Sequence, residues 1–426
     1  MTTRTQIRRP WIRAAWAAPV LALALAATAC STKAASSAPS ESAGIKTGPG
    51  VTASTITLGV LTDESGVFAG LGTPLTQAEQ LYWQLQNAKG GVCGRQVKLT
   101  IGDHGYQVQK AVTLYTDMSQ NILAITQLLG SPESAALLPS IQRDRIFTQI
   151  AGWPGGLLGN QYTQITGTTY DVEAINAVDW LVKSGKVKRG DSIGALYFQG
   201  DYGQNAFAGV QYAAGKNGLK VVAQEITSAQ TDMTSQVAVF KRGGVKAIIG
   251  SIAPTQTASL AGVSVATGLK VPIVVNGPGF DPHLLGTAAA SALEANVYVA
   301  TSLAPPSLNE PAVQQATSTW TAHYPKSAPA AVSVTYGWAA SEIMNKVLDQ
   351  ACANKDLTRS GVLTAFRQLT SVNTGGLVAA PLSYATVGQP AERSVYIASI
   401  DASLPGDTKS LGVFESANAQ SYQEGQ

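Results

Sequence analysis

Hydrophobic positions along the chain follow two alternating periods. Short apolar runs such as 55–61 (TITLGVL) predict buried strands, whereas apolar residues spaced three or four apart across 74–89 predict a helix with one buried face. Pro74 suits the first turn of that helix, and Gly90-Gly91 suits its end. Further strands are predicted at 96–102, 122–129 and 145–150, and a further helix at 108–119.

The alternation restarts after Tyr170 and continues toward the C-terminus. Helices are predicted at 171–183, 204–217, 233–242, 255–267, 310–323, 332–353 and 358–369. Strands are predicted at 192–198, 220–226, 245–250, 271–276 and 296–301, with extended segments near 376–384 and 394–400. This alternation is typical of the α/β class, in which helices cover both faces of parallel sheets, and its two runs predict two doubly wound lobes.

Doubly wound sheets bind ligands beyond the carboxyl ends of their strands, at the point where the strand order reverses. Two lobes that face each other would therefore bring the loops after their strands around one cleft. These loops are 62–73, 130–134, 151–155, 199–203 and 276–282.

The N-terminus has the pattern of a secretory signal peptide at 1–29. Four arginines precede an apolar run at 14–29, and small residues close it. A membrane-spanning helix is the alternative, but the run is shorter than the roughly 20 residues that a span needs, and Pro19 interrupts it. The Arg8-Arg9 pair leaves twin-arginine export open beside the Sec route.

The run ends Ala27-Thr28-Ala29-Cys30, which resembles a bacterial lipobox. The resemblance implies that Cys30 is acylated and becomes the N-terminus of a protein anchored to the outer side of the cell membrane. The segment 30–50 is rich in Ser, Ala, Gly, Pro and Lys, and this composition predicts a flexible tether.

The charge of the chain gives no support to a nucleic-acid partner, and none is expected. The whole chain carries a formal +3, but the signal holds four arginines and no acid, so the remainder is near −1. With Cys30 acylated, Cys93 and Cys352 remain, and an oxidising compartment favours a disulfide between them. The alternative is two buried free thiols that pack as small hydrophobic groups.

Several short motifs follow one another in a fixed order. They are ESG at 64–66, GGVCGR at 90–95, GSPES at 130–134, GDYG at 200–203, TDM at 231–233, GLKVP at 268–272 and YGWA at 336–339. In these motifs and their order the chain resembles the leucine/isoleucine/valine-binding-protein family, the solute-binding subunits of ABC transporters for branched-chain amino acids. The resemblance covers nearly all of the chain beyond the tether.

This resemblance implies a type I periplasmic binding protein fold, with two Rossmann-like lobes joined by three crossovers. The crossovers fall near 167–170, 300–303 and 378–383. The first lobe then comprises 51–168 plus 304–380, and the second comprises 169–303 plus 381–426.

The resemblance also implies a ligand site in the cleft. Ser134 matches the hydroxyl at a helix start that holds the ligand's carboxylate, and helix N-termini do bind anions. Tyr202 matches an aromatic of the second lobe and Tyr336 an aromatic at the rim, and Phe68 lies on a first-lobe loop. Ser134 can alternatively cap its helix, and the aromatics can pack in the core.

Two departures from the family pattern bear on the ligand. The stretch Ala151-Gly152-Trp153-Pro154 lacks the hydroxyl that amino acid binders place there, and Trp153 favours a flat or apolar ligand. Asp281 is the nearest candidate to receive a ligand ammonium, although a capping role is common for Asp before Pro. The expected ligand is therefore an amino acid-like molecule, an amide or an aromatic acid.

The function predicted is a monomeric solute-binding lipoprotein that passes its ligand to ABC permease subunits by hinge closure, with no cofactor, metal or enzymatic activity. A ligand sensor that signals to a membrane partner is the first alternative, since the fold is shared. A secreted hydrolase is the second, because Gly190-Asp191-Ser192-Ile193-Gly194 fits a nucleophile motif. That motif needs a strand before it and a helix after it, whereas here a strand follows.

Overall fold

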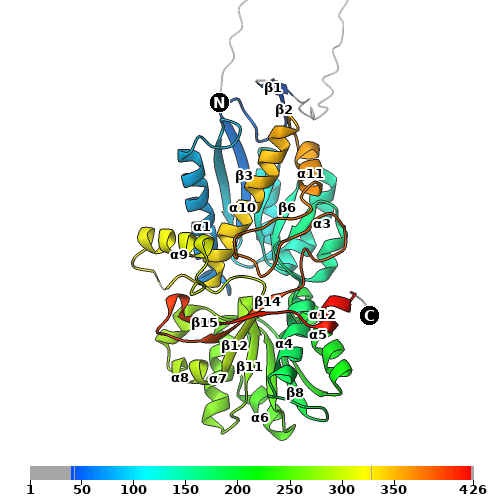
Figure 1. Cartoon of the computed structure of the whole chain (residues 1–426), viewed down its shortest axis with the longest axis vertical. Helices are drawn as coiled ribbons and strands as arrows, with labels where there is room; N and C mark the ends of the chain where they lie inside the picture. Colours follow the sequence, from blue (N-terminus) through cyan, green and yellow to red (C-terminus); the bar gives the residue numbers. More distant parts are fainter. Residues whose placement is uncertain (1–39, 43, 328, 424–426) are drawn as a thin grey trace, which may run out of the picture. The chain divides into compact units, whose positions relative to one another are not determined.

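The computed structural model describes residues 40–42, 44–327 and 329–423. The predicted signal peptide and Cys30 lie outside these residues. Within them, two parallel-stranded sheets with helices on both faces form two lobes, so the predicted α/β architecture is confirmed (Figure 1).

The first sheet has five parallel strands in the order β4-β3-β5-β6-β7. Its strands are β3 (Thr55–Thr62), β4 (Gln96–Asp103), β5 (Ala124–Leu129), β6 (Thr148–Ala151) and β7 (Thr163–Ile165). Its helices are α1 (Ala69–Ala88), α2 (Val108–Ser119), α3 (Ser131–Asp144), α9 (Pro311–His323), α10 (Val332–Ala353) and α11 (Arg359–Arg367). The strand order reverses between β3 and β5, which places the loops after both strands at one edge of the lobe.

The second sheet has seven strands in the order β15-β14-β12-β11-β10-β8-β9, and its last two strands along the chain pair antiparallel. Its strands are β8 (Ser192–Phe198), β9 (Lys220–Ile226), β10 (Ala247–Ser251), β11 (Ile273–Asn276), β12 (Val297–Thr301), β14 (Val395–Ile400) and β15 (Thr408–Phe414). Its helices are α4 (Tyr170–Lys183), α5 (Asp201–Asn217), α6 (Thr234–Arg242), α7 (Pro254–Ala266), α8 (Ala290–Asn296) and α12 (Ala417–Ser421). Here the order reverses between β8 and β10.

The chain passes between the lobes three times, after β7, after β12 and before β14. Two of these crossovers are joined by an isolated bridge between Leu303 and Val378. Gly167, at φ +98°, lies on the first crossover, after β7, and a side chain at this position would lie 2.1 Å from the Ser302 hydroxyl on the second. The three crossovers are therefore packed against one another.

Four local predictions were wrong. Helix α1 begins at Ala69, five residues before Pro74, because the amides of Leu71 and Gly72 already bond to the Phe68 carbonyl. The segment near 376–384 forms only isolated bridges. Residues 131–134 and 201–203 belong to helices and not to loops, since Gly130 and Gly200 make the turns alone with φ of +102° and +87°.

The fourth error concerns the predicted flexible tether, which ends earlier than Gly50. Strand β2 (Ile45–Thr47) pairs in parallel with β13 (Asp356–Leu357), and the Lys46 amide donates to the Lys355 carbonyl at 3.0 Å. Strand β1 (Ser40–Ser42) completes this small sheet. Backbone pairing with a distant segment, which composition does not report, orders this stretch.

Candidate functional site

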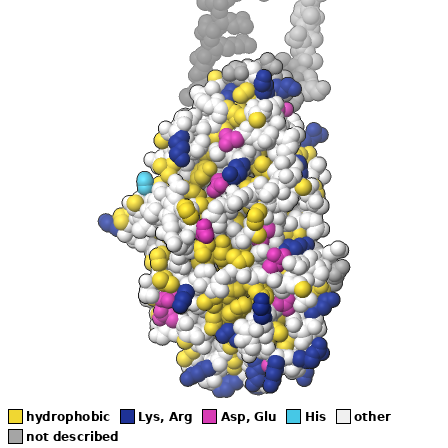
Figure 2. Space-filling view, viewed as in Figure 1, with side chains coloured by type: hydrophobic (Ala, Val, Ile, Leu, Met, Phe, Trp, Pro, Cys, Tyr) yellow, Lys and Arg dark blue, Asp and Glu magenta, His cyan; other side chains and the backbone are white. Residues whose placement is uncertain are grey.

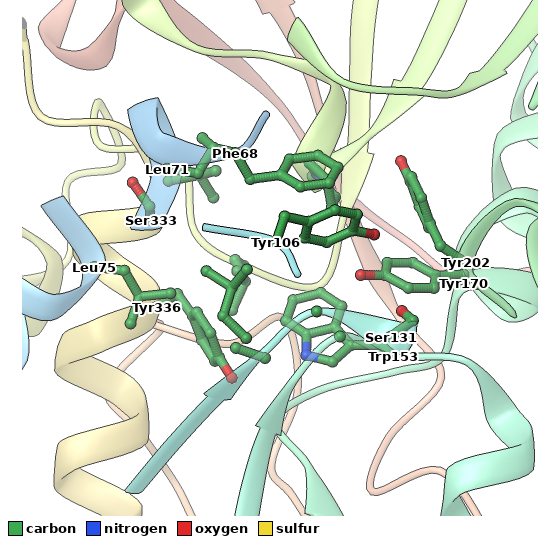
Figure 3. Close-up of a pocket in the computed structure, with 18 residues that line it drawn as sticks. Phe68, Leu71, Leu75, Tyr106, Ser131, Trp153, Tyr170, Tyr202, Ser333 and Tyr336 are labelled. Atoms are coloured by element: carbon green, nitrogen blue, oxygen red, sulfur yellow. The ribbon is translucent and has the colours of Figure 1, made fainter. Parts of the chain in front are cut away.

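A cavity lies between the lobes, at the carboxyl ends of their central strands. It encloses about 630 Å³ of space between atoms, a volume that includes open solvent at the mouth of the cavity. Residues from both lobes and from the crossovers line it (Figure 3). They are Phe68, Leu71, Leu75, Tyr106, Leu129, Gly130, Ser131, Ala151, Gly152, Trp153, Tyr170, Tyr202, Gly277, Pro278, Leu303, Val332, Ser333 and Tyr336.

Six aromatic rings form a continuous wall around this cavity. The ring centroids of Tyr170 and Tyr202 are 4.7 Å apart, and those of Trp153 and Tyr170 are 5.9 Å apart in a stacked arrangement. Phe68 of the first lobe lies 6.3 Å from Tyr202 of the second, edge to face. These separations are within the favourable range for aromatic pairs, so the rings hold one another in place and close the lobes over the cavity.

Two of the tyrosine hydroxyls are used by the protein itself. Tyr202 Oη donates to Asn276 Oδ1 at 2.6 Å, and Tyr336 Oη donates to the Ile150 carbonyl at 3.1 Å. These bonds fix the two rings and leave their faces as apolar surface. Tyr202 and Tyr336 therefore form apolar walls of the cavity.

A polar corner remains at the start of α3. In Figure 3 the hydroxyls of Tyr106 and Tyr170 point toward each other, and Ser131 lies beside Tyr170. Burial raises the pKa of Tyr106 and of Tyr170 well above the ordinary value, although a hydrogen bond with Ser131 lowers that of Tyr170. Both phenols are therefore neutral at physiological pH and can donate to an acceptor on a ligand.

Gly152 keeps this corner open. A side chain at position 152 would lie 2.9 Å from the Ser131 amide nitrogen and 3.0 Å from its hydroxyl oxygen. With glycine there, the amide and hydroxyl at the first residue of α3 stay accessible from the cavity. A helix start of this kind favours an anion, because its amides lack partners within the helix and the helix dipole is positive there.

Among the described residues, none that lines the cavity carries a charged side chain. The nearby Asp63 carboxylate is bonded to backbone amides, including that of Phe68 at 2.9 Å, and so positions the Phe68 ring. Glu133 is buried behind Gly130, and burial raises its pKa to about 7. Figure 2 shows Lys and Arg side chains gathered at the far end of the second lobe, away from the region where the lobes meet.

The structure brings four of the sequence-predicted ligand residues together around the cavity, namely Phe68, Trp153, Tyr202 and Tyr336. Ser134 lies outside it. Its side chain is fully buried, and its hydroxyl donates to the Gly130 carbonyl at 2.7 Å, because it sits on the side of α3 that packs into the lobe. Asp281 also lies outside and caps the short 3₁₀ helix η3 (Pro282–Gly286) through the His283 amide at 2.9 Å.

Sequence reasoning missed Ser131, Tyr106, Tyr170 and Ser333. Ser131 belongs to the same GSPES motif as Ser134, and a helix start placed one residue after Gly130 would have identified it. Tyr106 follows the end of β4 with φ +55°, and Tyr170 is the first residue of α4. Their proximity to the cavity depends on the crossover geometry, which no local pattern reports.

A disulfide joins Cys93, in the turn after α1, to Cys352, near the end of α10, with Cα atoms 6.2 Å apart. This bond lies away from the cavity and fastens two helices that pack against each other. In the described part of the chain, no cluster of three or more His, Cys, Asp or Glu side chains is arranged to hold a metal ion. No helix in that part is both long and apolar enough to cross a membrane.

Comparison with known proteins adds to this geometry. A family model described as periplasmic binding protein matches residues 55–406. A fatty acid ABC transporter substrate-binding protein from Thermomonospora curvata is 42% identical, with a TM-score of 0.87 over 89% of this chain and 97% of that one. No curated protein matches the chain.

Two more distant structures share the fold. A branched-chain amino acid ABC transporter protein from Thermus thermophilus, with bound valine, is 20% identical, with a TM-score of 0.76 over 86% of this chain and 98% of that one. A solute-binding protein from R. palustris in complex with benzoate is 18% identical, with a TM-score of 0.71 over 84% of this chain and 96% of that one. The resemblance seen in the sequence is thus confirmed, and the chain belongs to the periplasmic binding protein family, whose members work outside the cytoplasm.

Proposed function

We propose that this protein is a lipid-anchored solute-binding protein that captures a small apolar monocarboxylate and delivers it to an ABC importer. The observation that carries the proposal is the composition of the cavity. Aromatic and aliphatic side chains surround a corner of neutral donors at the start of α3, the Ser333 hydroxyl is a further neutral polar group in the lining, and no described charged side chain lines the cavity. Such a site suits a ligand with one anionic end and an apolar body.

The carboxylate would lie at the start of α3. There the Ser131 amide and hydroxyl and the phenols of Tyr106 and Tyr170 offer donors without adding a charge. Hydrogen bonds from these neutral donors to a charged carboxylate are about twice as strong as hydrogen bonds between two neutral groups. The body of the ligand would occupy the apolar part of the cavity, between Leu71, Leu75 and the Tyr336 ring.

A free amino acid fits this lining less well. Its ammonium would need a carboxylate, and Asp281, the sequence-based candidate, lies outside the cavity. Burying an unpaired ammonium is costly. The name of the 42% identical relative, a fatty acid transporter protein, supports the same class of ligand.

Calorimetry with octanoate, benzoate, 1-octanol and leucine tests the proposal. We expect octanoate or benzoate to bind more tightly than octanol or leucine. Ser131→Ala removes a hydroxyl at the proposed carboxylate position and should weaken octanoate binding by roughly tenfold, the value of one hydrogen bond to a charged group. Octanol binding should change less.

Ser134→Ala is the matched control, because it removes the same hydroxyl three residues away but outside the cavity. Its octanoate affinity should equal that of the unmodified protein. Tighter binding of leucine than of either acid, or equal loss in the two serine variants, would show that the ligand class or its orientation is wrong.

A further inference from the structure

Asp281 is held in a defined position at the seam between the lobes. It precedes η3 in the second lobe, and its Oδ1 accepts from the His283 amide at 2.9 Å and lies 2.7 Å from His283 Nδ1. The residue is 5% exposed. These contacts on Oδ1 leave the other carboxylate oxygen, Oδ2, directed away from η3.

Oδ2 reaches across the seam to the first turn of α1. The position that a side chain at Gly70 would occupy lies only 2.0 Å from it. Gly70 is the second residue of α1, at the end of the helix where the helix dipole is positive. Glycine at this position therefore lets a carboxylate of one lobe seat directly against a helix start of the other.

We propose that Gly70 and Asp281 form a latch that favours the closed arrangement of the lobes over the cavity and so helps to retain the solute. Asp281 acts as a positioning residue, since it lies outside the cavity lining. The contact joins residues of different lobes, so opening the cleft breaks it. Only contacts of this kind shift an opening equilibrium, because contacts present in both states cancel. The role in solute retention rests on the proposed function.

Gly70→Ala tests the latch by filling the space that Oδ2 occupies. The carboxylate cannot swing aside without losing both of its contacts to His283. Alanine suits a helix better than glycine does, so α1 itself should form normally, and thermal unfolding checks that the variant stays folded. We expect at least a tenfold weaker affinity for octanoate. Gly215→Ala, also in a helix but with open space around the new methyl group, should bind normally.

The double variant Gly70→Ala/Asp281→Ala separates a clash at the latch from general damage. Asp281→Ala alone loses the latch but creates no clash, and we expect about a threefold weaker affinity. The double variant should bind like Asp281→Ala, because the methyl group at position 70 no longer meets a carboxylate. Asp232→Ala, which removes another carboxylate that caps a helix start, serves as the control. Additive losses in the double variant would overturn the proposal.

A direct measurement of closure does not depend on the ligand class. Spin labels are placed on Val112→Cys in α2 and Val265→Cys in α7, which are 36% and 37% exposed and lie in different lobes. The full chain carries Cys30→Ser, and the Cys93–Cys352 disulfide is retained. We expect Gly70→Ala to shift the label-to-label distance toward the open state in ligand-free protein. Identical distance distributions in the labelled protein with and without Gly70→Ala would overturn the latch. Failure of octanoate to bind would overturn only the proposed function.

Discussion

At the scale of single residues, the tyrosines show how a hydrogen bond decides a role. Tyr202 and Tyr336 give their hydroxyls to protein acceptors and present ring faces to the cavity. Tyr106 and Tyr170 direct theirs toward the corner at Ser131. The same side chain thus serves as apolar wall in one place and as donor in another, and the difference lies in which acceptor the surrounding fold provides.

Buried carboxyl groups are a second residue-scale feature. Glu79 on α1 is fully buried, and this burial raises its pKa to about 8. A hydrogen bond with Thr126 lowers the pKa, but by less than burial raises it. Burial similarly raises the pKa of Glu173, beside the crossovers, to about 8. A carboxyl whose folded-state pKa is raised binds its proton more tightly in the folded than in the unfolded state. Its contribution to stability is fully present below pH 4.5 and is lost as the pH rises toward 8.

Glu79→Gln should therefore flatten the pH dependence of stability. Between pH 5 and pH 8 the free energy of unfolding of the unmodified protein should fall, relative to the variant, by up to about 1.4 kcal/mol per pH unit. Urea unfolding at several pH values measures this difference. Glu310→Gln, at an exposed position, is the control. Parallel pH profiles for Glu79→Gln and the unmodified protein would contradict the assigned burial effect.

At the scale of elements, the starts of helices position the site. Gly130 and Gly200 turn sharply after β5 and β8, so that α3 and α5 begin at once and carry Ser131 and Tyr202 to the cavity. Behind them, α1 and α10 pack against each other, and the disulfide between Cys93 and Cys352 fastens their ends. The site therefore rests on two helices that pack against each other and are joined by a disulfide near their C-terminal ends.

Removing that disulfide should lower stability but leave ligand affinity unchanged. For Cys93→Ala/Cys352→Ala we expect a loss of about 2–5 kcal/mol in the free energy of unfolding, since the bond restricts the unfolded chain. Urea unfolding and octanoate calorimetry provide the two readouts. Thiol labelling of denatured, unreduced protein is the independent check. Two labelled thiols in addition to Cys30 would show that the bond does not form.

At the scale of the whole molecule, the chain alternates between lobes, and this alternation makes capture possible. Two lobes joined by three crossovers can separate and approach while each sheet stays intact, and both contribute to the cavity lining. The N-terminal residues add the second large-scale property. The predicted signal peptide would direct export, and the lipid on Cys30 would then hold the binding domain at the membrane, where a permease operates.

Cys30→Ser should release the protein from membranes without altering its fold. This prediction rests on the lipobox-like sequence Ala27-Thr28-Ala29-Cys30. Fractionation of cells that express each form, with mass spectrometry of the mature N-terminus, measures the outcome. The control is thermal unfolding of both proteins, which should coincide. A soluble unmodified protein with a different N-terminus would exclude lipid anchoring.

Sequence patterns predicted most of the elements because strands and helices bury their apolar residues with different periods. The strand at 192–198 and the helix at 332–353 match β8 and α10 residue for residue. Boundaries failed where backbone hydrogen bonds, which apolar periodicity does not report, decided them. Strand β2 exists because β13 supplies a partner, and α1 begins before Pro74 because the Phe68 carbonyl accepts two amide bonds.

The candidate site likewise has some residues that local sequence patterns predicted and others that only the tertiary structure identified. The sequence by itself determined the α/β class, the family resemblance and four aromatic residues of the cavity, because apolar periodicity and short motifs are local properties. Only the tertiary structure decided that Ser131 faces the cavity while Ser134 packs inward, and that Asp281 meets Gly70 across the seam. Which way a side chain points, and what it meets, depends on the rotation of a helix and on the approach of two lobes, and both are set by contacts between residues far apart in the chain.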